Sequence, residues 1–202
     1  VGGRVRGIRK LNNESELAAY ASGAGMDFHI QEYIHYENEM GIYYYRFPDQ
    51  PSGNISGIVT KEFLKVTGDG RRSVRELLMQ NPRGILQLPE LEKNQPELLL
   101  KIIPKAETFT VLPYGNNARG AKFLDDSDKI TPSMVRMLDA LCRRIPDFYF
   151  GRLDIRYRNN QFLENGKDFM IIELNGAGSE PTHIYDPRHS LFYAWKEIVR
   201  HW

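Results

Sequence analysis

The stretch that decides the fold is Gly151-Arg152-Leu153-Asp154-Ile155-Arg156-Tyr157, followed after a polar turn by Phe169-Met170-Ile171-Ile172-Glu173-Leu174-Asn175-Gly176. Both runs are rich in apolar residues, and residues 158–168 between them contain the Asn and Gly residues that are typical of turns. Because side chains alternate across a strand, Arg152 and Asp154 project from one face, as do Glu173 and Asn175. A hairpin would therefore bring two carboxylates, one amide and one guanidinium into one patch.

The residue types of this patch suit a divalent metal ion and a phosphate group. Mg²⁺ prefers oxygen ligands and commonly bridges protein carboxylates to nucleotide phosphates, so Asp154, Glu173 and Asn175 are candidate metal ligands. The donor fork of Arg152 suits a phosphate or a carboxylate. The alternative is an ordinary salt-bridge network on the hairpin. Burying these groups on one face without a ligand would be costly, which favours a functional site.

Composition limits the kind of protein. With 202 residues, 41% hydrophobic and 26% charged, the chain is expected to be soluble and globular, and its net charge of +1 argues against a nucleic-acid scaffold. No apolar run is long enough to cross a bilayer and no signal peptide is evident, so a cytoplasmic location and no membrane partner are expected. The lone Cys142 excludes an intrachain disulfide and a cysteine metal cage, and its helical neighbours indicate that it fills core space.

The remaining pattern predicts short helices and neighbouring strands, and hence an α+β fold with a mainly antiparallel sheet and flanking helices. Ser73 and Glu76 form a capping-box pattern, and Pro132 stands at a position that suits the first turn of a helix. The predicted strands are 28–34, 40–47 and 55–66, and the predicted helices are 14–22, 74–80, 94–104, 132–145 and 190–201. The closing segment carries Tyr185, Phe192, Tyr193 and Trp195, which we expect to pack on the core rather than to form an interface.

Several residues outside the hairpin are candidate phosphate contacts. Gly2, Gly3 and Gly7 with Arg4, Arg6 and Arg9 would form a loop whose amides and guanidinium groups cover phosphates, although such turns are also common on protein surfaces. Lys61 stands in a mostly apolar predicted strand and is either a point charge for a phosphate or a snorkelling edge lysine. Arg119, in a polar loop, is either a clamp for a transferred phosphoryl group or an exposed arginine.

A connector near residue 33 has the features of a purine site. The backbone of Gln31, Glu32, Tyr33 and Ile34 would contact the adenine edge, while the carboxylate of Glu39 would accept hydrogen bonds from ribose hydroxyls. The alternative is an amphipathic strand with solvated acids. His183 follows the second strand of the hairpin closely and is a weaker candidate for a substrate contact.

The order of these motifs along the chain resembles the ATP-grasp superfamily. A glycine loop, a connector with a following acid, a strand lysine, a loop arginine, Arg152-x-Asp154 and Glu173-x-Asn175 appear in that sequence. The likeness is greatest to the carboxylate-amine ligases, the group that includes D-alanine:D-alanine ligase. Residues 66–78 are also similar to a segment of cyanophycin synthetase.

The resemblance implies an ATP-grasp fold in which ATP lies between two subdomains, with residues 1–33 a remnant of the small lid subdomain and 34–202 the large subdomain. It also implies ATP and one or two Mg²⁺ ions as cofactors, with Mn²⁺ as an alternative metal. On this basis Gly3, Arg4, Arg6 and Gly7 cover phosphates, Gln31 to Ile34 bind adenine, and Glu39 binds ribose. Lys61, Arg119 and Arg152 are the candidate catalytic cations, and Asp154, Glu173 and Asn175 hold the metal.

The implied reaction is a Mg-ATP-dependent ligation of a carboxylate to an amine or amino acid through an acyl phosphate. A small-molecule kinase and a nucleotide-binding domain without turnover are the alternatives. The family's lysine upstream of the glycine loop has no counterpart here, so we expect a fragment that lacks an N-terminal part and is impaired or inactive as a ligase. The expected partners are small-molecule substrates and no nucleic acid, and a homodimer is left open.

Overall fold

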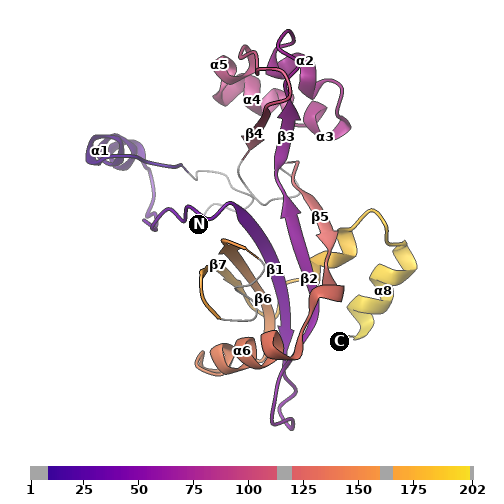
Figure 1. The fold of residues 1–202 in the computed structure, drawn as a ribbon. Coiled ribbons are helices and arrows are strands. Elements are labelled where there is room, and N and C mark those ends of the chain that lie inside the picture. The colour runs from indigo at the N-terminus through magenta and orange to yellow at the C-terminus, as the bar shows by residue number, and fades with distance from the viewer. Residues whose placement is uncertain (1–8, 113–119, 160–165, 201–202) are drawn as a thin grey trace. The chain divides into compact units, whose positions relative to one another are not determined.

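The computed structural model describes residues 9–112, 120–159 and 166–200 (Figure 1). The chain divides into two compact units, residues 1–35 and residues 36–202. The first unit contains α1 (Glu14–Gly23), and the second contains all the described strands and the other helices.

In the first unit, α1 begins where the sequence predicts it. The side chain of Asn13 accepts a hydrogen bond from the backbone N–H of Glu16 at 2.9 Å and so caps the helix. The predicted strand over 28–34 is wrong, because these residues have irregular backbone and pair with no described strand. A strand needs a partner to satisfy its backbone groups, and Ile30 is left 72% exposed without one.

The second unit is built on a five-stranded antiparallel sheet with the order β5-β2-β1-β6-β7. Its strands are β1 (Asn38–Tyr45), β2 (Asn54–Glu62), β5 (Lys122–Asp125), β6 (Phe150–Tyr157) and β7 (Phe169–Asn175). The strand β1 lies in the middle and pairs with β2 on one side and with β6 on the other. The structure therefore confirms the α+β class, the mainly antiparallel sheet and the hairpin formed by β6 and β7.

The predicted strand over 55–66 is two strands in two different sheets. After Phe63 the chain continues as β3 (Leu64–Thr67), which pairs with β4 (Thr108–Leu112) in a separate two-stranded sheet. The apolar pattern continues through the break because Leu64 and Val66 are buried in a second core. For this reason the sequence pattern does not reveal the change of sheet.

A small helical lobe gathers around β3 and β4 (Figure 1). Its helices are α2 (Val74–Leu78), α3 (Pro82–Ile85), α4 (Leu88–Asn94) and α5 (Pro96–Leu99). The capping box of Ser73 and Glu76 is confirmed at the start of α2. The single helix predicted over 94–104 is wrong, because α4 ends at Asn94 and Pro96 starts a new short helix. Proline lacks the N–H that a continuing helix would need.

One face of the large sheet is covered by α6 (Pro132–Cys142), whose first turn is capped by Thr131. Met134, Leu138 and Cys142 of α6 are fully buried against apolar side chains of the sheet. The strand β1 contributes Met40, Ile42 and Tyr44 to this core. Because side chains alternate along a strand, Glu39, Gly41 and Tyr43 face the opposite side of the sheet.

The short helix η3 (Ser127–Lys129) lies between β5 and α6, and the chain closes with the short helix η4 (Thr182–Tyr185) and the longer α8 (Leu191–Arg200). Phe192 and Trp195 of α8 are 77% and 54% exposed, so the expectation that they pack on the core is wrong. No helix in the described ranges is both long and apolar enough to span a bilayer.

Candidate functional site

The hairpin of β6 and β7 brings its four polar residues together as predicted. Arg152 is registered opposite Asn175, and Asp154 is registered opposite Glu173. The pairing shifts by one residue just after Asp154, which marks a bulge where the polar pairs end. The four side chains therefore belong to neighbouring positions on the face of the sheet opposite α6.

Hydrogen bonds join these four side chains into one network. Arg152 donates from Nε to Asp154 Oδ1 at 2.9 Å and from Nη2 to Asp154 Oδ2 at 3.2 Å. The amide of Asn175, oriented to satisfy both neighbours, accepts from Arg152 Nη2 at 3.1 Å and donates to Glu173 Oε1 at 3.1 Å. Asp154 is buried, whereas Glu173 is exposed. A ligand can therefore reach this network from the side of Glu173.

Gly41 makes room for the network. This glycine stands opposite Asp154 on β1, and a Cβ atom there would lie 3.0 Å from Asp154 Oδ1 and 3.2 Å from Arg152 Cδ. Contacts this short would displace both side chains. Gly41 belongs to none of the sequence motifs described above, although a glycine inside a strand is a known sign of a close approach of neighbouring atoms.

Lys61 links the hairpin to the other side of the site. Its Nζ lies 2.9 Å from Glu39 Oε1 and 3.2 Å from Asp154 Oδ2, and all three side chains are at most 5% exposed. The alternative of a snorkelling edge lysine is therefore excluded, because β2 is an inner strand and Lys61 is buried. A buried lysine between two carboxylates satisfies charges that would otherwise be costly to bury.

Arg156 completes the charged cluster, although it belongs to none of the predicted site motifs. Its Nη2 lies 3.4 Å from Glu39 Oε2, and its Nη1 donates to the carbonyl oxygen of Tyr36 at 3.3 Å. Glu39 is thus held between Lys61 and Arg156. The alternation of β6 places Arg156 on the same face as Asp154, which is the signal that would have identified it.

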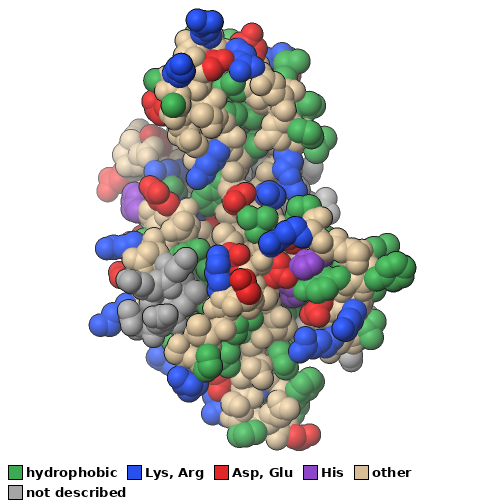
Figure 2. Space-filling model, turned by 45° about the vertical axis from the view of Figure 1, so that its right-hand side comes forward, with side chains coloured by type: hydrophobic (Ala, Val, Ile, Leu, Met, Phe, Trp, Pro, Cys, Tyr) green, Lys and Arg blue, Asp and Glu red, His purple; other side chains and the backbone are tan. Residues whose placement is uncertain are grey.

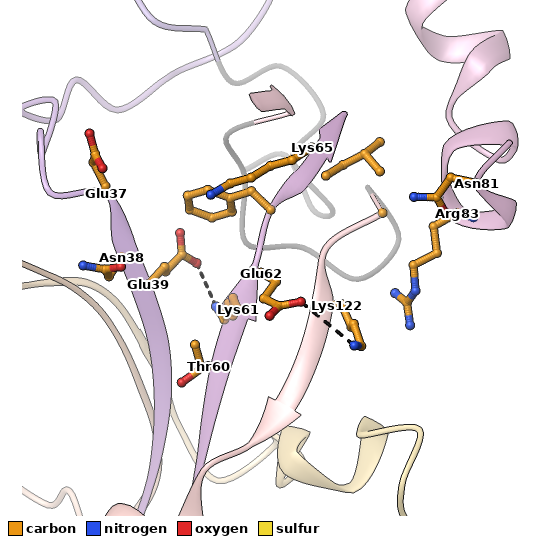
Figure 3. Close-up of a pocket in the computed structure, with 13 residues that line it drawn as sticks. Glu37, Asn38, Glu39, Thr60, Lys61, Glu62, Lys65, Asn81, Arg83 and Lys122 are labelled. Carbon is orange, nitrogen blue, oxygen red and sulfur yellow. Dashed lines mark hydrogen bonds and ion pairs between the residues drawn. The ribbon is translucent and has the colours of Figure 1, made fainter. Parts of the chain in front are cut away.

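A pocket of about 490 Å³ opens beside Glu39 and Lys61 (Figure 3). It lies between the ends of β1, β2 and β5 and the helix α3. Its lining residues are Glu37, Asn38, Glu39, Thr60, Lys61, Glu62, Phe63, Leu64, Lys65, Asn81, Arg83, Gly120 and Lys122. Figure 2 shows acidic and basic side chains next to one another on one face of the molecule. The cluster and the pocket share Glu39 and Lys61.

The donor atoms of the cluster are of the kind that Mg²⁺ prefers. Asp154 and Glu173 supply carboxylate oxygens, and Asn175 supplies an amide oxygen. Among the described residues, no group of three or more His, Cys, Asp or Glu side chains forms a metal cage. Magnesium is commonly held by only one or two carboxylates together with substrate phosphates, so the residues fit such a site.

Tyr43 and His183 have contacts within the protein. Tyr43 donates from its hydroxyl to the carbonyl oxygen of Ser179 at 2.8 Å, and burial raises the pKa of Tyr43. His183 is 2% exposed and packs over Gly57, and burial lowers its pKa. Its ring is therefore part of the interior, and the prediction that it contacts substrate is not supported.

The other predicted site residues lie outside the described residues or in the first unit. Gly3, Arg4, Arg6, Gly7 and Arg119 lie outside the described residues. Gln31, Glu32, Tyr33 and Ile34 belong to the first unit, whereas the cluster belongs to the second. Their roles in binding phosphates and adenine stay predictions.

This chain has only limited similarity to known proteins. No protein-family model matches the sequence, and no curated protein matches it either. Among solved structures, a bifunctional glutathione synthetase from Pasteurella multocida aligns with 77% of this chain at 16% sequence identity and a TM-score of 0.48. The alignment covers 23% of the length of that synthetase.

Proposed function

We propose that this chain is the nucleotide- and metal-binding part of an ATP-grasp ligase, which uses Mg-ATP to join a carboxylate to an amine or amino acid. The observation that carries the proposal is the meeting of Glu39, Lys61 and Asp154 from three strands in one buried cluster. The same cluster contains Arg152, Glu173 and Asn175. These six residues are the ones to which the motif order of the sequence assigns ribose, phosphate and metal contacts.

The cluster suits phosphoryl transfer because such catalysis depends on positioning and on neutralising charge. In this proposal Lys61 and Arg152 contact phosphate oxygens, and Glu39 accepts hydrogen bonds from the ribose. Asp154, Glu173 and Asn175 hold Mg²⁺, which would neutralise charge on the phosphate oxygens when bound. Arg119 would add a further cation, and Gly3, Arg4, Arg6 and Gly7 would cover the phosphates.

The proposed reaction has two steps. A carboxylate oxygen of the acid substrate attacks the γ-phosphorus of ATP, the bond to the β–γ bridging oxygen breaks, and ADP leaves. The amine nitrogen then attacks the carbonyl carbon of the acyl phosphate, inorganic phosphate leaves, and the nitrogen loses a proton. Neither step needs a covalent bond to the protein.

The test begins with calorimetric titration of Mg²⁺ and a non-hydrolysable ATP analogue. We expect Mg²⁺-dependent binding to the wild-type protein that is lost when Glu173 and Asn175 are both changed to Ala. A Glu92→Ala variant, altered at an exposed position of the helical lobe, is the matched control and should bind normally. If the affinity for the ATP analogue is the same with and without Mg²⁺, and the same in the double variant as in the wild-type protein, the metal assignment is rejected.

Turnover distinguishes the proposed ligase from its alternatives. A ligase releases ADP only when both an acid and an amine are supplied, whereas a small-molecule kinase releases ADP without an amine and leaves a stable phosphorylated product. A nucleotide-binding domain without turnover would bind the analogue and release no ADP with any pair of substrates.

A further inference from the structure

Arg83 presents a guanidinium group to the pocket from a firmly held backbone. It lies in α3, where the side chain of Asn81 accepts a hydrogen bond from the Arg83 backbone N–H at 3.0 Å. The next residue, Gly84, packs so closely on α2 that a Cβ atom there would lie 2.6 Å from the carbonyl oxygen of Leu78. The base of the Arg83 side chain is therefore fixed against the helical lobe.

The guanidinium of Arg83 is anchored but retains donors for a ligand. Nη1 donates to the carbonyl oxygen of Ala121 at 2.9 Å, and the residue is half-buried. In the described ranges 9–112, 120–159 and 166–200, no carboxylate forms an ion pair with Arg83. An arginine carries five N–H donors in a fixed fork, so one carbonyl leaves most of them unused.

Besides the buried Lys61, two further cations line the same pocket. Lys65 projects from β3 and Lys122 from β5, and Figure 3 shows Arg83 extending toward Lys122. Lys122 Nζ lies 4.0 Å from Glu62 Oε2, and the two side chains are 43% and 56% exposed, so this ion pair is weak. Of the other acids that line the pocket, Glu39 is already paired with Lys61 and Arg156, and Glu37 is exposed.

From this arrangement we infer that Arg83, together with Lys65 and Lys122, binds an anionic group in the pocket. The anion is a phosphate or a carboxylate, because both carry negatively charged oxygens that accept hydrogen bonds from a guanidinium group. Assigning the anion to the phosphate chain of the nucleotide or to the acid substrate rests on the proposed function. The inference that an anion binds here depends only on the side chains that line the pocket. In either case the helical lobe contributes directly to ligand binding.

The experiment is calorimetric titration of the whole chain with tripolyphosphate, succinate and the Mg-ATP analogue. We compare wild type, Arg83→Gln, and the double variant Lys65→Gln, Lys122→Gln, which keeps the bond between Arg83 and Ala121. The control is Arg75→Gln on the same lobe, where the arginine forms a surface ion pair with Glu92 at 3.0 Å. Thermal melting of each variant confirms folding.

Because Arg83→Gln removes a charged hydrogen bond to the anion, we expect it to weaken anion binding roughly ten- to a hundredfold. Arg75→Gln should have little effect on anion binding. The double lysine variant should weaken the same probe by a smaller factor. Weakened tripolyphosphate binding assigns the anion to a phosphate chain, and weakened succinate binding assigns it to a carboxylate.

A wild-type protein that binds neither probe overturns the inference, as does equal weakening by Arg83→Gln and Arg75→Gln. If Arg83→Gln does not fold, an unchanged affinity in the double lysine variant overturns it. Arg83-dependent tripolyphosphate binding without Mg-dependent binding of the ATP analogue would keep the anion site and reject the proposed nucleotide function.

Discussion

The ammonium group of Lys61 lies 3.2 Å from a carboxylate oxygen of Asp154, and both side chains are at most 5% exposed. The two residues come from β2 and β6, which do not pair with each other but flank β1. The contact therefore crosses the central strand, at the level where Gly41 leaves space above the sheet. It joins the hairpin of β6 and β7 to the wall of the pocket.

Replacing Lys61 with Met should destabilise the protein strongly. The change leaves Glu39 and Asp154 buried without the cation between them, and breaking a buried pair in this way typically costs about 3–5 kcal/mol. The free energy of unfolding, measured with urea, tests this expectation. Lys65→Met, at an exposed position on the next strand, is the control and should change the free energy of unfolding by less than about 0.5 kcal/mol. Equal effects of the two substitutions would contradict the buried network.

Adding one methyl group at Gly41 should disturb the site. In Gly41→Ala the new carbon would lie 3.0 Å from Asp154 Oδ1 and 3.0 Å from Val59 Cγ1, so neighbouring atoms must move. Overpacking of this kind costs roughly 1–3 kcal/mol. We expect weaker Mg-nucleotide binding in calorimetry as well as lower stability. Gly23→Ala, where no atom lies within 4 Å, is the control, and a Gly41→Ala protein with unchanged stability and binding would rule out the close packing.

Arg156 should act as a positioning residue for Glu39. Its guanidinium holds Glu39 Oε2 at 3.4 Å, opposite the contact with Lys61. If Glu39 binds ribose, the wild-type protein should favour ATP over 2′-deoxy-ATP by about tenfold, the value of one charged hydrogen bond. Arg156→Gln should reduce this preference while leaving Mg²⁺ dependence in place. An unchanged preference for ATP over 2′-deoxy-ATP in Arg156→Gln would show that Arg156 has no part in ribose recognition.

Asp186 should contribute to stability only above acidic pH. The side chain of Arg188 holds the pKa of the Asp186 carboxyl well below its usual value, and backbone N–H groups of Arg188 and Asp125 act in the same direction. Because the folded pKa lies below the unfolded one, this contribution is complete above the unfolded value of about 3.8 and is lost as the pH falls toward the folded value.

Urea unfolding at several values between pH 2 and pH 7 measures this dependence. Asp186→Asn should lower stability near neutral pH and make the acid limb of the curve less steep. Asp128→Asn, at an exposed position, is the control. An acid limb of unchanged steepness in Asp186→Asn would show that another group is responsible for the loss of stability.

Local patterns in the sequence predict part of the site without reference to the fold. The alternation of β6 and β7 is sufficient to place Arg152 with Asp154 and Glu173 with Asn175, because successive side chains on a strand point to opposite faces. The capping box of Ser73 and the start of α6 at Pro132 are equally local. In each of these cases the determining interactions lie within a few residues.

The tertiary structure decides which distant residues meet. Pairing of β1 with both β2 and β6 brings Glu39, Lys61 and Asp154 into contact, and it also adds Arg156 and Gly41 to the site. The change of sheet after Phe63 and the irregular backbone over 28–34 likewise depend on which strands find partners. The physical reason is that a strand is stabilised by hydrogen bonds to another segment of chain, so its own residues specify its two faces but not its neighbours.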